Sequence, residues 1–292
     1  MELELKRGGR TARVETLGGE LVSYRDERGL EYIWGGDPAY WPGRNPLLFP
    51  IVGMLKEGKI RFDGREYAME RHGFARRRKF TPAARGEDWV RLELRESAET
   101  LALYPYPFRL AVEQRLTDTG FSTAVTVANP GEGPLPFCLG AHTGFRCPLE
   151  AGERFEDYEL VFPERESCPT LLLRDGLLDR PAALPCLEDT GTLPLDYRWF
   201  DALDTLIFEG LRSRSVTLRS RKSGRGVRVS FDGFPMLAFW TMPGKKAPYL
   251  CIEPWHGCAA GTAEGPEFTD KAHCIVLAPG ESRTACPILS KR

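Results

Sequence analysis

Glycine and proline interrupt this chain so often that long helices have little room to form. There are 30 Gly and 23 Pro among 292 residues, and both residue types break helices, whereas short strands joined by turns tolerate them. Between the breaks, residues 90–95, 110–116 and 227–231 alternate apolar and polar side chains. This alternation is the period of a half-buried strand. Asp63-Gly64 lies between two such stretches and indicates a β-hairpin.

The remaining pattern favours strands as well. Further strands are expected at 122–129, 213–220 and 272–278, and the main helical signal is the short stretch 97–103. No βαβ alternation, internal repeat or low-complexity linker is visible in the sequence. Regular strand spacing with frequent turns predicts an all-β fold, a large sandwich, in a single domain that spans residues 1–292.

Charge and hydropathy exclude several classes of partner. The formal net charge is −1, so no global field attracts nucleic acid or anionic lipid. Hydrophobic residues make up 42% of the chain, enough for a sizeable core. No apolar run approaches the roughly 18 residues that a membrane span needs, and the first residues lack an apolar signal segment. The expected protein is soluble and cytoplasmic, without nucleic-acid or membrane partners.

The cysteines do not form a metal-binding or redox motif. There are eight Cys and no C-x-x-C pair, which argues against a zinc ribbon or a thioredoxin-type site. Cys251, His256 and Cys258 are close in sequence, but their spacing matches no zinc pattern. We therefore expect reduced, mostly buried thiols and no metal site.

Three short motifs contain the residue types that proton transfer needs. Residues 71–76 read R-H-G-F-A-R, residues 140–145 read G-A-H-T-G-F, and residues 251–257 read C-I-E-P-W-H-G. They place His72, His142 and Glu253 each beside Gly or Pro and an aromatic residue. Imidazole can give and take a proton near neutral pH, and a carboxylate at the end of an apolar strand can act as a base. Proton transfer to and from a sugar fits this combination.

Each of these residues also has a structural interpretation. His142 can be a core histidine bonded to a backbone carbonyl, and Glu253 can be a core carboxylate paired with an arginine. His72 leads into four consecutive cations, which form either a solvated face or a site for hydroxyls or a phosphate. Trp255 and Phe145 can stack on a sugar ring or simply pack in the core. From the residues alone, both interpretations stay open.

The motifs together resemble the aldose 1-epimerase (galactose mutarotase-like) family, especially its LacX-like branch. The resemblance extends from about residue 17 to about residue 282, and the order and spacing of the motifs agree. The matching stretches are 45–53, 72–76, 140–145, 155–158, 203–208 and 251–257.

The resemblance implies a fold and a set of roles. The fold would be a large, twisted, antiparallel β-supersandwich with an open cleft on one sheet. His142 would be the general acid and Glu253 the general base. His72 would hold sugar hydroxyls or assist at the ring oxygen, Asp204 would contact ring hydroxyls, and Arg76 would contact the sugar or a phosphate.

One position departs from the family pattern. Relatives often carry a sugar-binding arginine after the stretch 45–53, and this chain has Met54 there. Arg44, Lys56 or Arg76 are the candidates to replace the missing donor. The histidine motif has Thr143 where many relatives have proline, but it retains the histidine and the glycine.

The leading hypothesis is a cofactor-free aldose 1-epimerase, or mutarotase, an isomerase of carbohydrate metabolism. It would interconvert the α and β anomers of a free aldose or a sugar phosphate by acid–base ring opening. The alternatives are a hexose 6-phosphate mutarotase and a non-catalytic carbohydrate-binding or sugar-sensing protein on the same fold. Met54 favours the binding protein, whereas His142 and Glu253 favour the enzyme.

Overall fold

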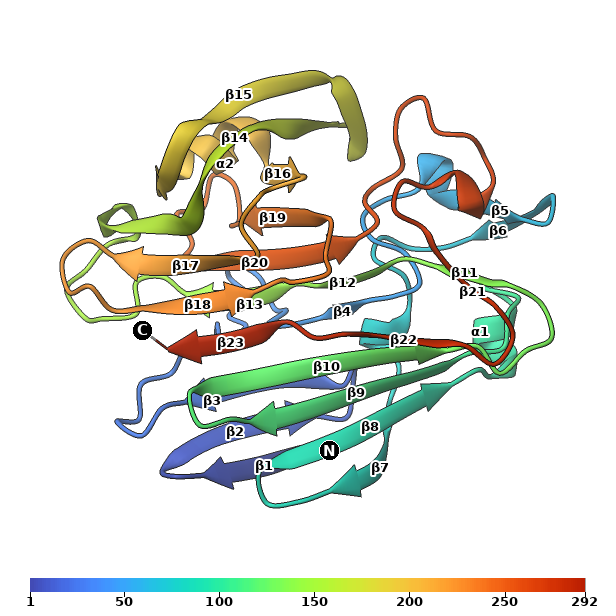
Figure 1. The fold of residues 1–292 in the computed structure, drawn as a ribbon, viewed down its shortest axis with the longest axis horizontal. Coiled ribbons are helices and arrows are strands. Elements are labelled where there is room, and N and C mark those ends of the chain that lie inside the picture. Colours follow the sequence, from blue (N-terminus) through green and yellow to red (C-terminus); the bar gives the residue numbers. More distant parts are fainter. Residues whose placement is uncertain (292) are drawn as a thin grey trace.

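Antiparallel strands make up most of the chain, as the computed structural model shows for the residues that it describes, 1–291 (Figure 1). One hydrogen-bonded sheet of 16 strands dominates the fold. It divides into halves of six and ten strands, which are joined where Leu171 of β14 pairs with Ile207 of β16. The expected all-β sandwich is confirmed.

The six-stranded half consists of β4 (Leu47–Leu48), β12 (Leu139–Ala141), β13 (Thr143–Arg146), β16 (Thr205–Glu209), β19 (Met236–Trp240) and β20 (Tyr249–His256). The ten-stranded half consists of β7 (Thr81–Arg85), β8 (Trp89–Arg95), β9 (Arg109–Leu116), β10 (Gly120–Ala128), β14 (Tyr158–Arg174), β15 (Leu177–Pro194), β17 (Ser215–Ser220), β18 (Gly226–Ser230), β22 (Ser282–Ala285) and β23 (Ile288–Lys291).

Smaller elements flank these halves. A three-stranded sheet is formed by β1 (Glu2–Arg7), β2 (Arg10–Glu15) and β3 (Glu20–Arg25). Two-stranded pairs are formed by β5 (Lys59–Phe62) with β6 (Arg65–Ala68), and by β11 (Leu135–Phe137) with β21 (Ile275–Leu277). The helical elements are α1 (Ala98–Leu101), α2 (Tyr197–Leu203), η1 (Lys56–Gly58), η2 (Ala75–Arg77), η3 (Phe155–Asp157) and η4 (Phe268–Asp270).

Most of the expected elements are present. The strands expected at 90–95, 110–116, 122–129 and 227–231 correspond to β8, β9, β10 and β18, and Asp63-Gly64 turns between β5 and β6. Of the stretch 272–278 only Ile275–Leu277 is a strand. The helix α1 begins after Ser97, whose side chain accepts a hydrogen bond from the Thr100 amide. We did not anticipate α2, although Asp196 caps its N-terminus in the usual way.

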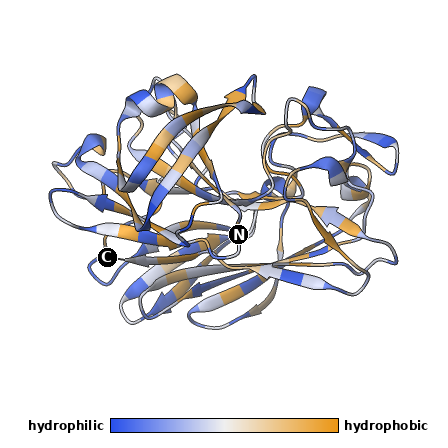
Figure 2. Ribbon diagram, turned by 45° about the horizontal axis from the view of Figure 1, so that its top comes forward, coloured by the Kyte–Doolittle hydropathy of each residue, from blue (hydrophilic) through white to orange (hydrophobic). Residues whose placement is uncertain are grey.

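Burial follows the strand pattern. Hydrophobic and hydrophilic residues alternate along many of the strands (Figure 2), and one cluster of buried side chains includes residues from Leu3 to Leu289. The strand β20 is an exception, because all but the last of its residues are buried. One face of β20 contributes to this core, and its other face forms the floor of a cavity. The single-domain organisation stays a prediction.

Aromatic packing holds two of the sequence motifs, residues 45–53 and 71–76, against each other. The ring of Phe49 lies 6.0 Å from that of Phe74 and 5.3 Å from that of Phe108, measured between centroids. Gly73 has a φ of +70°, and a Cβ atom there would lie 2.3 Å from the carbonyl oxygen of Phe49. Only glycine permits this approach. The segments 45–53 and 71–76 are therefore held against each other.

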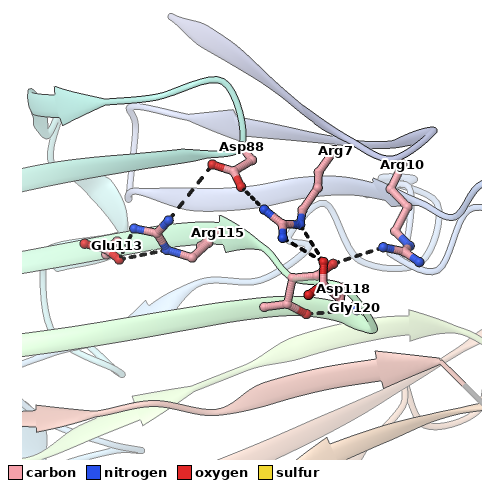
Figure 3. Close-up of polar contacts among 8 residues, drawn as sticks. Arg7, Arg10, Asp88, Glu113, Arg115, Asp118 and Gly120 are labelled. Carbon is pink, nitrogen blue, oxygen red and sulfur yellow. Dashed lines mark hydrogen bonds and ion pairs between the residues drawn. The ribbon is translucent and has the colours of Figure 1, made fainter.

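Charged side chains join the N-terminal sheet to the larger half (Figure 3). Arg7 of β1 forms ion pairs with Asp88 and with Asp118, the latter at 2.7 Å. Arg115 bridges Asp88 at 4.0 Å and Glu113 at 3.0 Å. Exposed ion pairs of this kind contribute about 0–1 kcal/mol each. The contacts therefore orient the sheet more than they stabilise it.

None of the helices in residues 1–291 combines the length and the apolar character of a membrane span.

Candidate active site

A cavity of about 380 Å³ lies above the central strands of the six-stranded half. Its volume is within the usual range of small-molecule sites, roughly 300–1,000 Å³. A larger hollow of about 630 Å³ beside β6 and η2 has no histidine in its lining, so volume alone does not locate the site. The smaller cavity is lined by Trp41, Gly53, Met54, Arg71, His72, Arg76, His142, Leu173, Gly176, Asp204, Thr205, Ile207, Trp240, Met242, Pro243, Glu253, Trp255 and Ala259.

Strand register brings His142 and Glu253 together. The strands on either side of His142 both pair with β20, with Gly140 opposite Trp255 and Thr143 opposite Ile252. The same register places His142 opposite Glu253, and His142 Nε2 lies 3.3 Å from Glu253 Oε1. The two residues expected to act as acid and base are thus in direct contact at the bottom of the cavity.

Burial controls the protonation of this pair. Burial raises the pKa of the Glu253 carboxyl well above its usual value, and the charge of Asp204 adds to the rise. The indole N–H of Trp255 opposes the rise, but it does not complete a hydrogen bond. Burial lowers the pKa of His142 to about 3. Both shifts have the same cause, because burial disfavours the charged form of each group.

Two polar atoms of the pair have no partner. Within residues 1–291, nothing forms a hydrogen bond with His142 Nδ1 or with Glu253 Oε2. An unpaired buried polar atom typically costs about 1–3 kcal/mol. Such atoms cluster at sites that bind a ligand, because the ligand supplies the missing hydrogen bonds.

His72 is held in a fixed orientation beside His142. Its backbone adopts a φ of +67°, and its amide donates to the Gly53 carbonyl at 3.0 Å. Its Nδ1 accepts from the Gly53 amide at 3.1 Å, which leaves the hydrogen of the neutral ring on Nε2. The rings of His72 and His142 meet edge-on with centroids 5.7 Å apart. Burial, followed by the charges of His142 and nearby arginines, keeps the pKa of His72 well below its usual value.

Aromatic rings enclose the pair. Trp41 stacks on His142 with ring centroids 4.9 Å apart, and Trp240 meets His142 edge-on at 5.6 Å. Sequence reasoning did not identify Trp41, because no chemical motif surrounds it. Its place depends on the fold, in which Gly43 leaves room for the ring: a Cβ atom at Gly43 would lie 2.5 Å from it.

The other expected contacts have different outcomes. Trp255 and Asp204 both line the cavity, and Asp204 Oδ2 accepts a hydrogen bond from Thr205 Oγ1 at 3.0 Å.

Phe145 does not line the cavity. Phe145 pairs with Leu250 across the sheet and is 1% exposed, on the face that contributes to the core. Successive strand residues point to opposite faces, so Phe145 and His142, an odd number of residues apart, point in opposite directions. The expected sugar contact by Phe145 is corrected on this ground.

Two arginines line the cavity near Met54. Arg76 was expected there; Arg71 was not. Arg71 Nη2 lies 2.7 Å from Met54 Sδ, so its guanidinium lies at the end of the methionine side chain. The other replacement candidates point elsewhere. Arg44 Nε donates to the Gly35 carbonyl at 3.0 Å, and Lys56 Nζ donates to the Glu264 carbonyl at 2.9 Å.

The bottom of the cavity, where His142 meets Glu253, also contains residues that could hold a cation. His142, Cys251 and Glu253 each present a ligand atom, and these atoms lie within 4.8 Å of one another. Burial raises the pKa of the Cys251 thiol well above its usual value. A zinc ion needs the thiolate, so this environment works against a zinc site.

Comparisons with known proteins point in one direction. The family model described as Aldose 1-epimerase matches residues 1–290. The plasmid-encoded protein LacX of Lactococcus lactis subsp. lactis is 41% identical over 287 residues, which cover 96% of this chain and 95% of LacX. A galactose mutarotase related enzyme from Lactobacillus acidophilus superposes with a TM-score of 0.95 at 27% identity, over 100% of this chain and 97% of that one. A galactose mutarotase-like protein from Lactobacillus casei gives 0.93 at 26% identity, over 100% of both chains.

Proposed function

Because the chain belongs to the aldose 1-epimerase family, we propose that it is a cofactor-free mutarotase that interconverts the α and β anomers of an aldose. The observation that carries the proposal is the contact of 3.3 Å between His142 Nε2 and Glu253 Oε1 at the bottom of an aromatic-walled cavity. A protein that only binds sugar has no need of a buried acid–base pair. The cytoplasmic location expected from the sequence stays a prediction.

The chemistry requires one base and one acid. In the proposed reaction Glu253 takes the proton of the anomeric hydroxyl while His142 gives a proton to the ring oxygen. The bond between C1 and the ring oxygen breaks, and C1 becomes an aldehyde. Rotation about the C1–C2 bond presents the other face of the carbonyl, and the reverse proton transfers close the ring. Each positioned acid or base typically contributes about 10²–10⁴-fold.

The proton count of the pair agrees with this cycle. Before ring opening the proton is on His142, and after ring opening it is on Glu253, so the pair holds one proton throughout. The burial that disfavours charge on both groups favours the second arrangement in the empty site. Sugar hydroxyls that donate to Glu253 stabilise its charged form, so substrate binding prepares the first arrangement.

The surrounding residues position the ring. Trp41, Trp240 and Trp255 offer apolar surfaces for the C–H faces of a sugar. The Nε2–H of His72 can donate to a hydroxyl, and the carboxylate of Asp204 can accept from one. Holding the substrate in one orientation removes part of the entropic barrier to proton transfer.

A non-catalytic sugar-binding protein is the second candidate, and Met54 favours it. The thioether that lines the cavity cannot supply the hydrogen bonds of the arginine found in many relatives. Arg71 brings a guanidinium to the same part of the cavity, which favours the enzyme.

Polarimetry on freshly dissolved α-glucose and α-galactose tests the proposal. We expect the protein to accelerate the approach to anomeric equilibrium over buffer for at least one aldose, and Glu253→Gln to lose the acceleration while it still binds the sugar. If the protein binds an aldose, as measured by calorimetry, and leaves the rate of anomer exchange at the buffer value for every aldose and aldose phosphate offered, the binding-protein function replaces the enzyme.

A further inference from the structure

We propose that a second cavity, separate from the candidate active site, binds a small organic carboxylate, and that Arg214, His256 and Arg283 hold its carboxylate group. This binding site goes beyond the proposed mutarotase function and does not depend on it. The second cavity, called here the back cavity, is open and has a volume of about 580 Å³. It shares no lining residue with the cavity that contains His142 and Glu253.

The back cavity lies at the end of the strand that carries Glu253. His256 is the last residue of β20, three positions after Glu253. Successive strand residues point to opposite faces, and accordingly Trp255 lines the candidate active site whereas His256 lines the back cavity. A ligand in the back cavity therefore leaves the candidate active site free.

The Nε2 atom of His256 cannot satisfy both of its neighbours. It lies 2.5 Å from the carbonyl oxygen of Gly233 and 3.2 Å from Nη2 of Arg283. A carbonyl oxygen only accepts and a guanidinium only donates, so the first contact requires a hydrogen on Nε2 and the second requires its absence. The closer contact places the hydrogen on Nε2. Arg283 Nη2 therefore faces another donor, and a ligand that supplies an acceptor would remove this conflict.

The second guanidinium of the back cavity is already held in place. Arg214 Nη1 donates to the Phe234 carbonyl at 3.4 Å, and Arg214 Nη2 donates to the Leu211 carbonyl. The N–H groups that these two carbonyls do not use remain for a ligand, because a guanidinium has five of them. A binding group that is oriented beforehand loses less entropy when the ligand binds.

The charges in the lining favour a ligand with one negative charge. In residues 1–291, neither Arg214 nor Arg283 forms an ion pair with a carboxylate. The acidic residue in the lining is Asp232, which is exposed. The imidazole of His273 is already taken by Glu209, so we do not count it as a ligand group. Two guanidiniums against one carboxylate leave one positive charge unbalanced, which matches a monocarboxylate better than a phosphate dianion or a polyanion.

An apolar wall next to the cations suits the organic part of such a ligand. Val276 lines the back cavity and is 50% exposed. Pro235 and Ile275 line it as well. An organic acid can cover these side chains while its carboxylate meets the planar guanidiniums, whose paired N–H groups match the two carboxylate oxygens. A bare inorganic anion would leave the apolar wall uncovered.

The protonation of His256 provides a reporter for binding. Burial lowers the pKa of His256 to about 4, and the positive charge of Arg283 adds to the effect. The Gly233 carbonyl acts in the opposite direction, and His273 contributes a further small decrease. A carboxylate bound beside Arg283 offsets its charge and favours the charged imidazole, so binding should raise the pKa of His256.

An NMR titration of the full chain with benzoate, phenyl phosphate and benzyl alcohol tests the proposal. We expect benzoate to bind saturably, to shift the ring resonances of His256 and to raise its pKa above about 4, while the resonances of His142 stay in place. Phenyl phosphate and the uncharged benzyl alcohol should bind more weakly. Arg214→Gln and Arg283→Gln should each weaken benzoate binding by roughly 10- to 100-fold, as expected for lost charge-assisted hydrogen bonds.

Arg212→Gln is the matched control, because Arg212 is exposed on the same segment as Arg214 and does not line the back cavity. It should leave benzoate binding unchanged, and cooperative thermal melting shows that each variant is folded. Equal weakening by Arg212→Gln would reduce the effect to general charge attraction and overturn the proposal. Weakening by Arg71→Gln but not by Arg283→Gln would place the anion in the candidate active site. Tighter binding of phenyl phosphate, or no saturable binding of benzoate, would reject the carboxylate site.

Discussion

Residues 1–291 contain two histidine–glutamate pairs that differ in their surroundings. His142 and Glu253 meet at the bottom of the cavity, with side chains 11% and 2% exposed. His273 and Glu209 meet near the surface, with side chains 30% and 28% exposed. Arg180 forms a further ion pair with Glu209. The two pairs have the same chemical groups, so their differences come from the environment.

That environment reverses the acidity of the carboxyl group. Burial dominates at Glu253 and raises its pKa well above the usual value. At Glu209 burial acts in the same direction, but hydrogen bonds from Arg180 and His273 outweigh it and lower the pKa. The surface pair is a satisfied ion cluster, and the cavity pair keeps unpaired atoms. A histidine beside a carboxylate is therefore a candidate for catalysis only where its neighbours leave it unsatisfied.

The largest expected difference between the pairs is in rate. His142→Gln should reduce the acceleration of mutarotation by about 10²–10⁴-fold, because it removes the proton donor to the ring oxygen. His273→Gln, the matched control, should leave the rate unchanged. Polarimetry on the best substrate measures both. Equal losses in the two variants would mean that the contrast between the pairs has no bearing on catalysis.

The contributions of Glu253 and Glu209 to the stability of the fold should also change with pH in opposite directions. A carboxyl whose pKa is raised on folding makes the native state bind more protons, so its contribution to stability falls as the pH rises above the usual glutamate value. Glu253→Gln should therefore gain stability relative to wild type between about pH 5 and pH 8, by about 1–3 kcal/mol. At Glu209 the pKa is lowered, so the contribution is present above the usual glutamate value and is lost as the pH falls. Glu209→Gln should therefore be less stable than wild type by up to about 1 kcal/mol throughout this range, since the pair is partly solvated, and the difference should shrink only as the pH falls below the usual glutamate value of about 4.3.

Urea denaturation at about pH 3, pH 5 and pH 8 gives the free energies of unfolding for wild type and the two variants. The difference between Glu253→Gln and wild type should change between pH 5 and pH 8, whereas the difference between Glu209→Gln and wild type should change only below pH 5. A Glu253→Gln difference that stays constant between pH 5 and pH 8 would show that burial does not govern the protonation of Glu253.

The smallest effect isolates the aromatic cover of the cavity pair. Trp41→Ala removes the ring stacked on His142 and admits water, so the pKa of His142 should rise from about 3 towards its usual value. A rise of one unit corresponds to about 1.4 kcal/mol. An NMR titration of the imidazole resonances measures it, and the His273 resonances, which Trp41 does not contact, serve as the internal control. If the His142 titration is unchanged, burial by the strands, and not by Trp41, lowers the pKa of His142.

Much of the architecture could be predicted because strand signals are local. The alternation in β8, β9 and β18 and the Asp63-Gly64 turn need only neighbouring residues, and each of these elements is present. The helix α2 was overlooked because its apolar residues resemble the strands around it. The error at Phe145 was avoidable, because the alternation that predicts the strand also separates it from His142.

Other parts of the site were not accessible from the sequence. Trp41 and Arg71 reach the cavity from loops, and their places depend on how distant segments pack. Gly73 lets the loop that carries Arg71 approach Phe49 closely, and Arg71 lies beside Met54. No spacing rule along the chain expresses such a contact.

The sequence by itself determined the class of fold and pointed to His142 and Glu253 as the candidate acid and base, because both inferences rest on short patterns of neighbouring side chains. Tertiary structure decided what those residues can do. Register across β20 places His142 against Glu253, and burial without partners shifts their pKa values in opposite directions. The physical reason is that acidity depends on solvation and on nearby charge, and both are set by residues that are distant in the chain and close only in the fold.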